Sequence, residues 1–378
     1  MPTAAITKID MLSRGSLVFA NGPEMWAPTV FGNRDKSRSA LLKALSDPKP
    51  GTVVEIVDHI GTGKSFLVDT FYTEFEQHRR GGGREGVPKF VVTPRNAKGG
   101  LEALRKMSGY EFIVFDEVDS KTAPGVTRNT MGLRDTLRLA NDVLGSPFTS
   151  LIVVGDWALD NAQLWERLPN CQTRTRMPME PLDEEFFLLA MALRLKRYMP
   201  QVASAADPNE LREVARQLFE AELLECLLPH TDTPVATFRS VLWIAGKLAG
   251  ELESSTAPCV IAGDHARSWF RLEPIWFDSD GQEEFARGLF RLVRDRRSPS
   301  APFKSLSLEE LRDACPVKGI GDNQTYLSNI IIPMINANLL MYTGIPYAGG
   351  EHYAHRFAGP YLPTPLSFLH AVFDGIPV

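Results

Sequence analysis

The sequence predicts an α/β core built on a parallel sheet, followed by a mostly helical part. Four apolar runs bounded by turn residues fit buried strands, and they read TVVEIV, KFVVTP, EFIVFDE and SLIVVGD. Amphipathic stretches such as GGLEALRKM and MGLRDTLRLANDVL fall between them, which is the alternation that parallel strands require. The strands stop at PLDEEFF, where Asp183 fits a helix N-cap.

Composition limits the possible functions. The chain has 378 residues, 44% of them hydrophobic, which favours two or three domains. A formal charge of -5 gives no general attraction to nucleic acid, so any such binding depends on local basic faces. The four cysteines are widely spaced, which argues against a zinc knuckle or a disulfide framework. Without a leader or a long apolar stretch, we expect a cytoplasmic protein that does not bind membranes.

The stretch VVEIVDHIGTGKSFLVDTF combines a strand, a glycine loop and a helix. In such a loop, backbone amides and a helix N-terminus converge on an anion. In the Walker A pattern Lys64 reaches the β- and γ-phosphates and Ser65 binds Mg²⁺. Asp58 replaces the first glycine of the pattern, and Asp tolerates left-handed backbone. The predicted nucleotide-binding residues of this segment are Gly61, Thr62, Gly63, Lys64, Ser65 and Phe66.

A second acidic motif follows a later strand, in FIVFDEVD. It fits a Walker B motif, in which a carboxylate at the strand's end holds Mg²⁺ and its neighbour polarises the attacking water. Asp116 takes the first role and Glu117 the second. We therefore expect ATP and Mg²⁺ as cofactors, Ser65 and Asp116 as metal ligands, and ATP hydrolysis.

With these motifs, the chain resembles the AAA+ ATPases over roughly residues 26 to 250. The segment VFGNRDKSRSALLKAL resembles the one that packs around adenine, which would place Arg34 at the nucleotide. The resemblance puts Asp156 at the sensor 1 position, which usually holds Asn, Thr or Ser. It makes Arg174 or Arg176 the arginine finger that completes a neighbouring subunit's site, and Arg239 a candidate for sensor 2. An ATP-dependent homo-oligomer is implied.

The predicted fold is thus a P-loop AAA+ core with a helical lid and a C-terminal winged-helix domain. The expected ranges are 1–200 for the core, 201–256 for the lid, 257–281 for a connector and 282–378 for the winged helix. This order resembles the origin-recognition and initiator branch, and PMEPLDEEFFLLAMALRLK also resembles the ATP-dependent transposition regulators. Both resemblances imply an ATP switch that assembles on or regulates a DNA transaction.

The composition of the last domain leaves a second possibility open. From 303 to 378 it has four Lys or Arg against six Asp or Glu, and the expected recognition helix DNQTYLSNIIIPMINANLL has no basic residue. Asn323, Gln324 and Asn329 could read bases there. Phosphate contacts would have to come from nearby arginines, namely Arg291, Arg294, Arg296 and Arg297. The alternative is a switch whose winged helix docks a partner protein.

Overall fold

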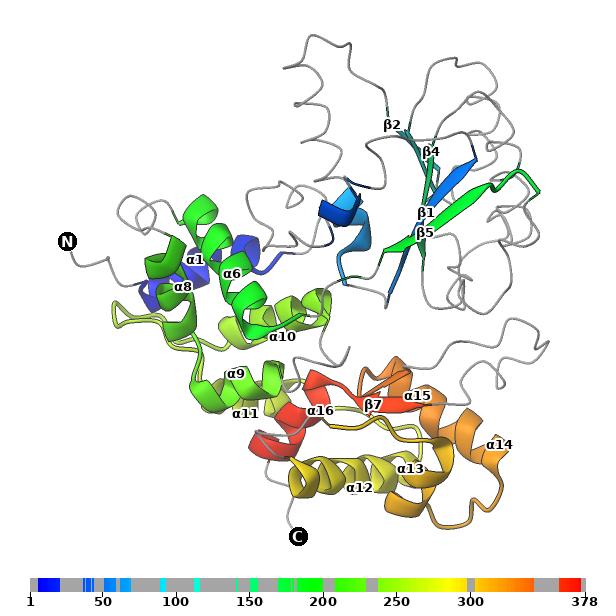
Figure 1. Cartoon of the computed structure of the whole chain (residues 1–378). Helices are drawn as coiled ribbons and strands as arrows, with labels where there is room; N and C mark the ends of the chain where they lie inside the picture. Colours follow the sequence, from blue (N-terminus) through cyan, green and yellow to red (C-terminus); the bar gives the residue numbers. More distant parts are fainter. Residues whose placement is uncertain are drawn as a thin grey trace. The chain divides into compact units, whose positions relative to one another are not determined.

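The structure is a computed structural model (Figure 1). It describes residues 6–20, 37, 39–41, 43, 51–58, 62–68, 89–92, 112–115, 141, 150–155, 169–177, 179, 182–199, 208–228, 237–297, 303–342 and 360–374. The chain divides into two compact units. The sheet unit comprises Arg34–Glu180 and Ile345–Gly350, and the helical unit comprises Met1–Asn33, Pro181–Gly344 and Glu351–Val378. In the described ranges, no helix has the length and apolar character needed to span a membrane.

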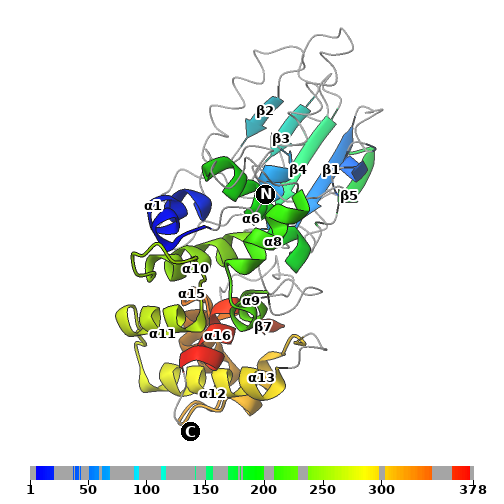
Figure 2. The same cartoon turned by 90° about the vertical axis from the view of Figure 1, so that its left-hand side faces the viewer.

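The sheet unit holds five parallel strands in the order β2-β3-β4-β1-β5, which Figure 2 shows side by side. Their bounds are β1 Thr52–Val57, β2 Lys89–Val92, β3 Phe112–Phe115, β4 Ser150–Gly155 and β5 Thr173–Met177. The four apolar runs of the sequence correspond to β1 to β4, so the expected parallel α/β sheet is confirmed. Gly51 precedes β1 with φ +75°, and a Cβ there would lie 2.7 Å from the Asn170 carbonyl oxygen. This close approach requires glycine.

Both faces of the sheet bury apolar side chains, Val53, Ile113 and Phe115 on one face and Val54, Ile56 and Val114 on the other. Val54 and Ile56 of β1 are fully buried, and they cluster with Leu67 and Val68 of the helix at residues 64–68. Successive side chains of a strand point to opposite faces, so Glu55 lies on the other face. Glu55 is nevertheless 0% exposed. A carboxylate at such a position needs a polar partner.

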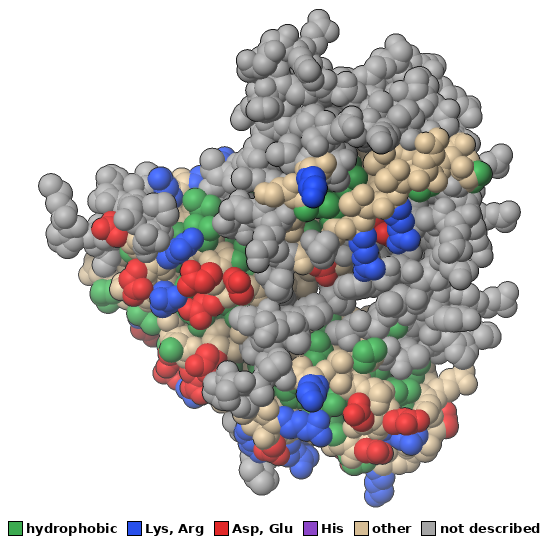
Figure 3. Space-filling model, in the orientation of Figure 1, with side chains coloured by type: hydrophobic (Ala, Val, Ile, Leu, Met, Phe, Trp, Pro, Cys, Tyr) green, Lys and Arg blue, Asp and Glu red, His purple; other side chains and the backbone are tan. Residues whose placement is uncertain are grey.

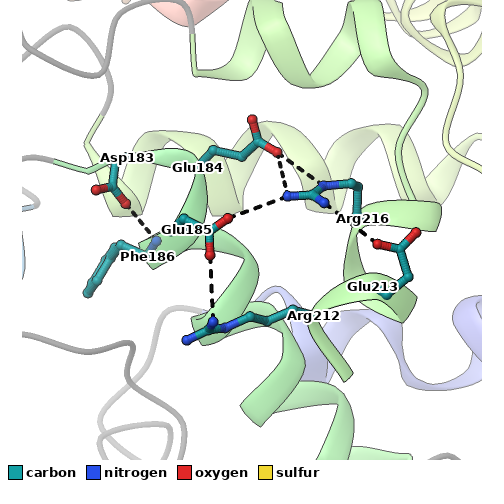
Figure 4. Close-up of polar contacts among 7 residues, drawn as sticks. All are labelled: Asp183, Glu184, Glu185, Phe186, Arg212, Glu213 and Arg216. Atoms are coloured by element: carbon teal, nitrogen blue, oxygen red, sulfur yellow. Dashed lines mark hydrogen bonds and ion pairs between the residues drawn. The ribbon is translucent and has the colours of Figure 1, made fainter. Parts of the chain in front are cut away.

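The helical unit begins with α1 (Lys8–Val18) and continues after the sheet. Its next helices are α6 Glu184–Tyr198, α8 Pro208–Gln217, α9 Ala221–Leu227, α10 Phe238–Gly250, α11 Gly263–Leu272 and α12 Asp280–Arg296. Asp183 caps α6 as expected, because its carboxylate accepts a 2.6 Å hydrogen bond from the Phe186 amide. Figure 4 shows how α6 and α8 are joined by charge pairs, in which Arg216 contacts Glu184 and Glu185.

A buried arginine fixes α1 to α6. Arg194 is 4% exposed, and its Nη1 donates to the carbonyl oxygens of Val18 at 2.9 Å and Ala20 at 2.8 Å. Burial lowers the pKa of this guanidinium to about 10. The two carbonyls belong to the C-terminal end of α1, where helix carbonyls lack intrahelical partners and attract cations. The contact therefore joins the first helix of the chain to the helices that follow the sheet.

The range 257–281, expected to be a connector, contains α11. Local sequence signals for this helix are weak because its N-cap residue, Ala262, has no capping side chain. Other groups satisfy its first amides: the Glu220 carboxylate accepts from the Gly263 amide at 2.7 Å, and His265 Nδ1 accepts from the Ala262 amide at 2.8 Å. Burial of Trp269 then holds the helix against its neighbours. The predicted domain boundaries themselves stay predictions.

The end of the chain combines short helices with an antiparallel pair of strands. The helical elements are α13 Leu308–Ala314, α14 Asn323–Tyr326, the π-helical η5 Leu327–Ile331, α15 Ile332–Asn336, α16 Pro365–Leu369 and the π-helical η7 His370–Asp374. The strands are β6 Leu340–Tyr342 and β7 Tyr361–Pro363. An isolated bridge also pairs Leu306 with Tyr361.

Pro333 explains the change of helix type between α14 and α15. Proline has no amide hydrogen, and its ring crowds the carbonyl four residues earlier, which here belongs to Asn329. The π-helical stretch η5 lies immediately before this point. Gln282 of α12 supplies the missing donor, because its Nε2 lies 3.1 Å from the Asn329 carbonyl oxygen. The expected recognition helix is thus one continuous but distorted helix anchored to α12.

Candidate nucleotide-binding site

The strand order indicates a binding site at the carboxyl ends of the strands. β1 lies between β4 and β5, while the strand that follows it in sequence, β2, lies at the far edge. The connection after β1 therefore leads to one side of the sheet, to β2, and the connection after β4 leads to the other side, to β5. Open α/β sheets bind ligands outside the carboxyl ends of their strands at such a switch point. The loop that begins at Asp58 starts at this edge.

The described part of the loop has the geometry of an anion site. Gly63 adopts φ +90°, a conformation open to glycine at no steric cost. The Leu67 amide donates to the Gly63 carbonyl oxygen at 2.9 Å, which is the first bond of the helix at 64–68. The amides of Lys64, Ser65 and Phe66 belong to the first turn of this helix, where the helix dipole favours a negative group.

Lys64 is directed back into the loop. Its side-chain Nζ lies 2.8 Å from the main-chain carbonyl oxygen of Asp58, and the residue is 9% exposed. The contact involves the Asp58 backbone, so it does not depend on which side chain stands there. The ammonium thus lies within the same loop as the amides at the helix start. An ammonium beside the start of a helix is an arrangement that suits a negatively charged group.

The neighbouring predicted residues are also described. Thr62 and Ser65 are half-buried, while the Phe66 side chain is 7% exposed and packs inward. The backbone amide of Phe66 is therefore the part of this residue that can serve a phosphate. Five other predicted residues, Arg34, Gly61, Asp116, Glu117 and Asp156, lie outside the described residues. β3 ends at Phe115 and β4 ends at Gly155, one residue before Asp116 and Asp156 respectively.

Arg174 has a partner that sequence reasoning missed. Its Nε and Nη2 donate to one carboxylate oxygen of Glu55, at 2.9 and 2.6 Å. Glu55 is 0% exposed, while the Arg174 side chain is 40% exposed. The strand register explains the contact: Val53 is level with Arg174 and Glu55 with Arg176, so both arginines share the face of β5 beside Glu55. The only sequence signal was a single acid inside the apolar run TVVEIV.

Arg176 and Arg239 are both exposed. Arg176 lies on β5, two residues after Arg174 and on the same face of the strand. Arg239 is the second residue of α10, a helix that Thr237 caps through the Ser240 amide. α10 belongs to the helical unit and the loop belongs to the sheet unit. The sensor 2 role of Arg239 stays a prediction.

A scan against protein-family models finds no match, and neither does a comparison with curated proteins. Among solved structures, the Aeropyrum pernix ORC1 protein in complex with DNA is 13% identical, with 95% of this chain and 96% of that chain covered at a TM-score of 0.44. Cdc6p from Pyrobaculum aerophilum is 15% identical, with 95% and 97% covered and a TM-score of 0.41. A Thermotoga maritima RuvB mutant is 14% identical, with 92% and 96% covered and a TM-score of 0.41. Each of these three structures is at most 15% identical to this chain, with a TM-score of at most 0.44.

Proposed function

We propose that the protein is an ATP-binding and ATP-hydrolysing switch of the AAA+ type that assembles on or regulates a DNA transaction. The observation that carries this proposal is the position of Lys64, which begins the helix after the loop that follows β1 and turns its ammonium back to the Asp58 carbonyl. A polyphosphate bound at the helix N-terminus would meet three consecutive amides and this ammonium. Ser65 follows at the position from which a hydroxyl binds Mg²⁺ in the Walker A pattern.

Hydrolysis in this proposal depends on two acids next to the loop. β3 and β1 flank β4 in the sheet, and all three strands run in the same direction. Asp116 and Glu117 come directly after β3, so the proposal puts them at the edge where the phosphates bind. Asp116 would hold Mg²⁺ through its carboxylate, and Glu117 would accept a proton from the attacking water.

The arginine finger belongs to a neighbouring copy in this account. Arg174 is level with Val53, five residues before Asp58, which corresponds to about 16 Å along the strand. A side chain at that height lies far from the phosphates of its own loop. The same side chain on another copy could supply positive charge where the γ-phosphate departs. The proposal therefore includes an ATP-dependent homo-oligomer, with Arg174 or Arg176 as the finger.

For the end of the chain, we propose a winged-helix domain. Support comes from α12, α13 and the distorted helix from α14 to α15, followed by the β6–β7 pair and the Leu306 bridge to β7. The exposed side chains of the distorted helix are uncharged, among them Asn323, Gln324 and Asn329. This absence of charge is the observation that keeps the alternative, docking of a partner protein, as a second candidate.

Binding of a labelled DNA duplex, with and without ATP and at two salt concentrations, tests the proposal. We expect tighter binding with ATP and a steep loss of affinity as salt rises, because phosphate contacts release counterions. A chain that binds ATP but no DNA under either condition would exclude the DNA role and leave the protein-docking switch. A chain that binds neither would exclude both.

A further inference from the structure

The arginines of α12 form a separate surface of the helical unit. From 287 to 297 the chain has five Arg and one Asp. Arg287, Arg291 and Arg294 recur at spacings of four and three residues, so they lie along one face of the helix. All three are exposed. We call these three residues the α12 arginine row.

The structure separates this row from the other two arginines of the segment. Arg297 is paired with acids of α9, since its guanidinium lies 3.6 Å from Glu222 and 2.9 Å from Glu225. Arg296 lies on a different side of the helix, 140° from Arg291 at 100° per residue. Between those two directions α12 packs against the end of α13, where a Cβ on Gly288 would lie 3.1 Å from Cys315 Cβ. Arg297 and Arg296 therefore do not belong to the row.

Two of the three arginines in the row, Arg291 and Arg294, are poorly neutralised, while Arg287 is paired with Glu283. Within the part of the chain that the structure describes, Arg291 makes one hydrogen bond, from Nε to the Arg287 carbonyl oxygen at 3.4 Å, and no ion pair. Arg294 lies 3.8 Å from Asp295, at the long end of ion-pair distances, whereas Arg287 lies 2.7 Å from Glu283. Basic residues in a last turn complement the helix dipole, but Arg287 and Arg291 lie before it. The dipole does not account for them.

We infer that the α12 arginine row binds the phosphate backbone of double-stranded DNA, independently of sequence. The row spans about 10 Å along the helix, since each residue rises about 1.5 Å. Phosphates of one DNA strand recur at about 3.4 Å along the axis, so the row matches a short stretch of one backbone. Arginine also presents a fork of donors that suits phosphate oxygens.

On α12 itself the chemistry favours a duplex over a single strand, although Trp276, which precedes the helix, is 86% exposed. Proteins that hold single strands combine basic grooves with exposed aromatic rings on which bases stack. Both aromatic residues of α12, Phe285 and Phe290, are buried. Figure 3 shows acidic and basic side chains interspersed over the described surface of the face it draws.

The inference rests on the proposed function only in taking DNA as the partner. It assigns the backbone contact to α12, and not to the uncharged helix from α14 to α15. Arg291→Ala/Arg294→Ala removes two charges of the row. Arg267→Ala/Arg271→Ala removes two exposed charges from α11 and serves as the matched control, because the net charge of the chain changes equally. Both variants act on surface residues, and circular dichroism checks that they fold.

The measurement is fluorescence anisotropy of a labelled duplex of about 20 base pairs over a salt series, with a single strand of equal length as a second probe. The α12 variant should weaken duplex binding about tenfold or more and reduce the slope of log K against log salt by about 2, equally for unrelated sequences. The α11 control variant should keep the affinity and the salt slope of the unchanged chain.

Equal losses in the two variants, or none in the α12 variant, would overturn the inference. If ATP-dependent duplex binding persisted in the α12 variant, the proposed function would stand and only the inference about α12 would be lost. Stronger binding of the single strand, lost in the same variant, would contradict the duplex assignment. No DNA binding by the unchanged chain would overturn both the inference and the DNA role.

Discussion

Arg174 donates two hydrogen bonds to the buried carboxylate of Glu55, through Nε at 2.9 Å and Nη2 at 2.6 Å. The pair joins the edge strand β5 to β1, the strand that leads into the loop. Loss of Arg174 would leave a charge with 0% exposure without this partner. Removing one partner of a buried pair is costly because the other charge stays desolvated.

Arg174→Ala should therefore lower the free energy of unfolding of the sheet unit by about 2 kcal/mol, less than for a fully buried pair because Arg174 is partly exposed. Urea unfolding measures the free energy of unfolding of each variant. Arg176→Ala, which leaves the Glu55 bonds in place, is the control and should cost less. Equal losses from the two variants would show that the Glu55 bonds contribute nothing specific.

Asp58→Gly should tighten ATP binding. The Asp58 main-chain carbonyl that binds Lys64 is kept in this variant, so only the side-chain carboxylate is lost. Removing a negative charge near a polyanion lowers repulsion, and the gain should shrink as salt rises. Calorimetry at two salt concentrations measures both effects. An unchanged dissociation constant would mean that the carboxylate faces away from the ligand.

Glu117→Gln should preserve ATP binding and stop hydrolysis. Glutamine keeps the size of the side chain but cannot accept the proton of the attacking water. Phosphate release measures hydrolysis, and binding is measured in parallel. A variant that hydrolyses ATP at the normal rate, or that no longer binds it, would refute the role given to Glu117.

Mixing two inactive variants should restore part of the ATPase activity if the finger acts between copies. One chain carries Lys64→Ala and the other Arg174→Lys or Arg176→Ala, so that a mixed interface combines an intact loop with an intact arginine. Arg174→Lys keeps a positive charge beside Glu55 and limits damage to the sheet. A protein that stays monomeric by light scattering with saturating ATP and DNA would contradict the oligomer.

The strands and α6 could be predicted because their signals are local. Apolar runs bounded by turns specify β1 to β4, and Asp183 is a visible N-cap for α6. The Glu55–Arg174 pair could not be predicted, because it depends on β5 lying next to β1, a neighbour distant in sequence. α11 was missed for a similar reason: Glu220, more than forty residues earlier, binds its first amide. Lys64 and Ser65 could be predicted as site residues because they belong to a short motif, and the motif lies between a strand and a helix in the structure as expected.

The most direct test of the account is ATP binding by Lys64→Ala, measured by isothermal titration calorimetry with Mg²⁺. Lys43→Ala is the matched control, since Lys43 is an exposed lysine of the same sheet unit. The account predicts that Lys64→Ala weakens ATP binding about a hundredfold or more, because an ammonium enclosed in the loop pairs with the phosphates, while Lys43→Ala binds normally. ATP binding by Lys64→Ala at the affinity of the unchanged chain would contradict a nucleotide site at this loop.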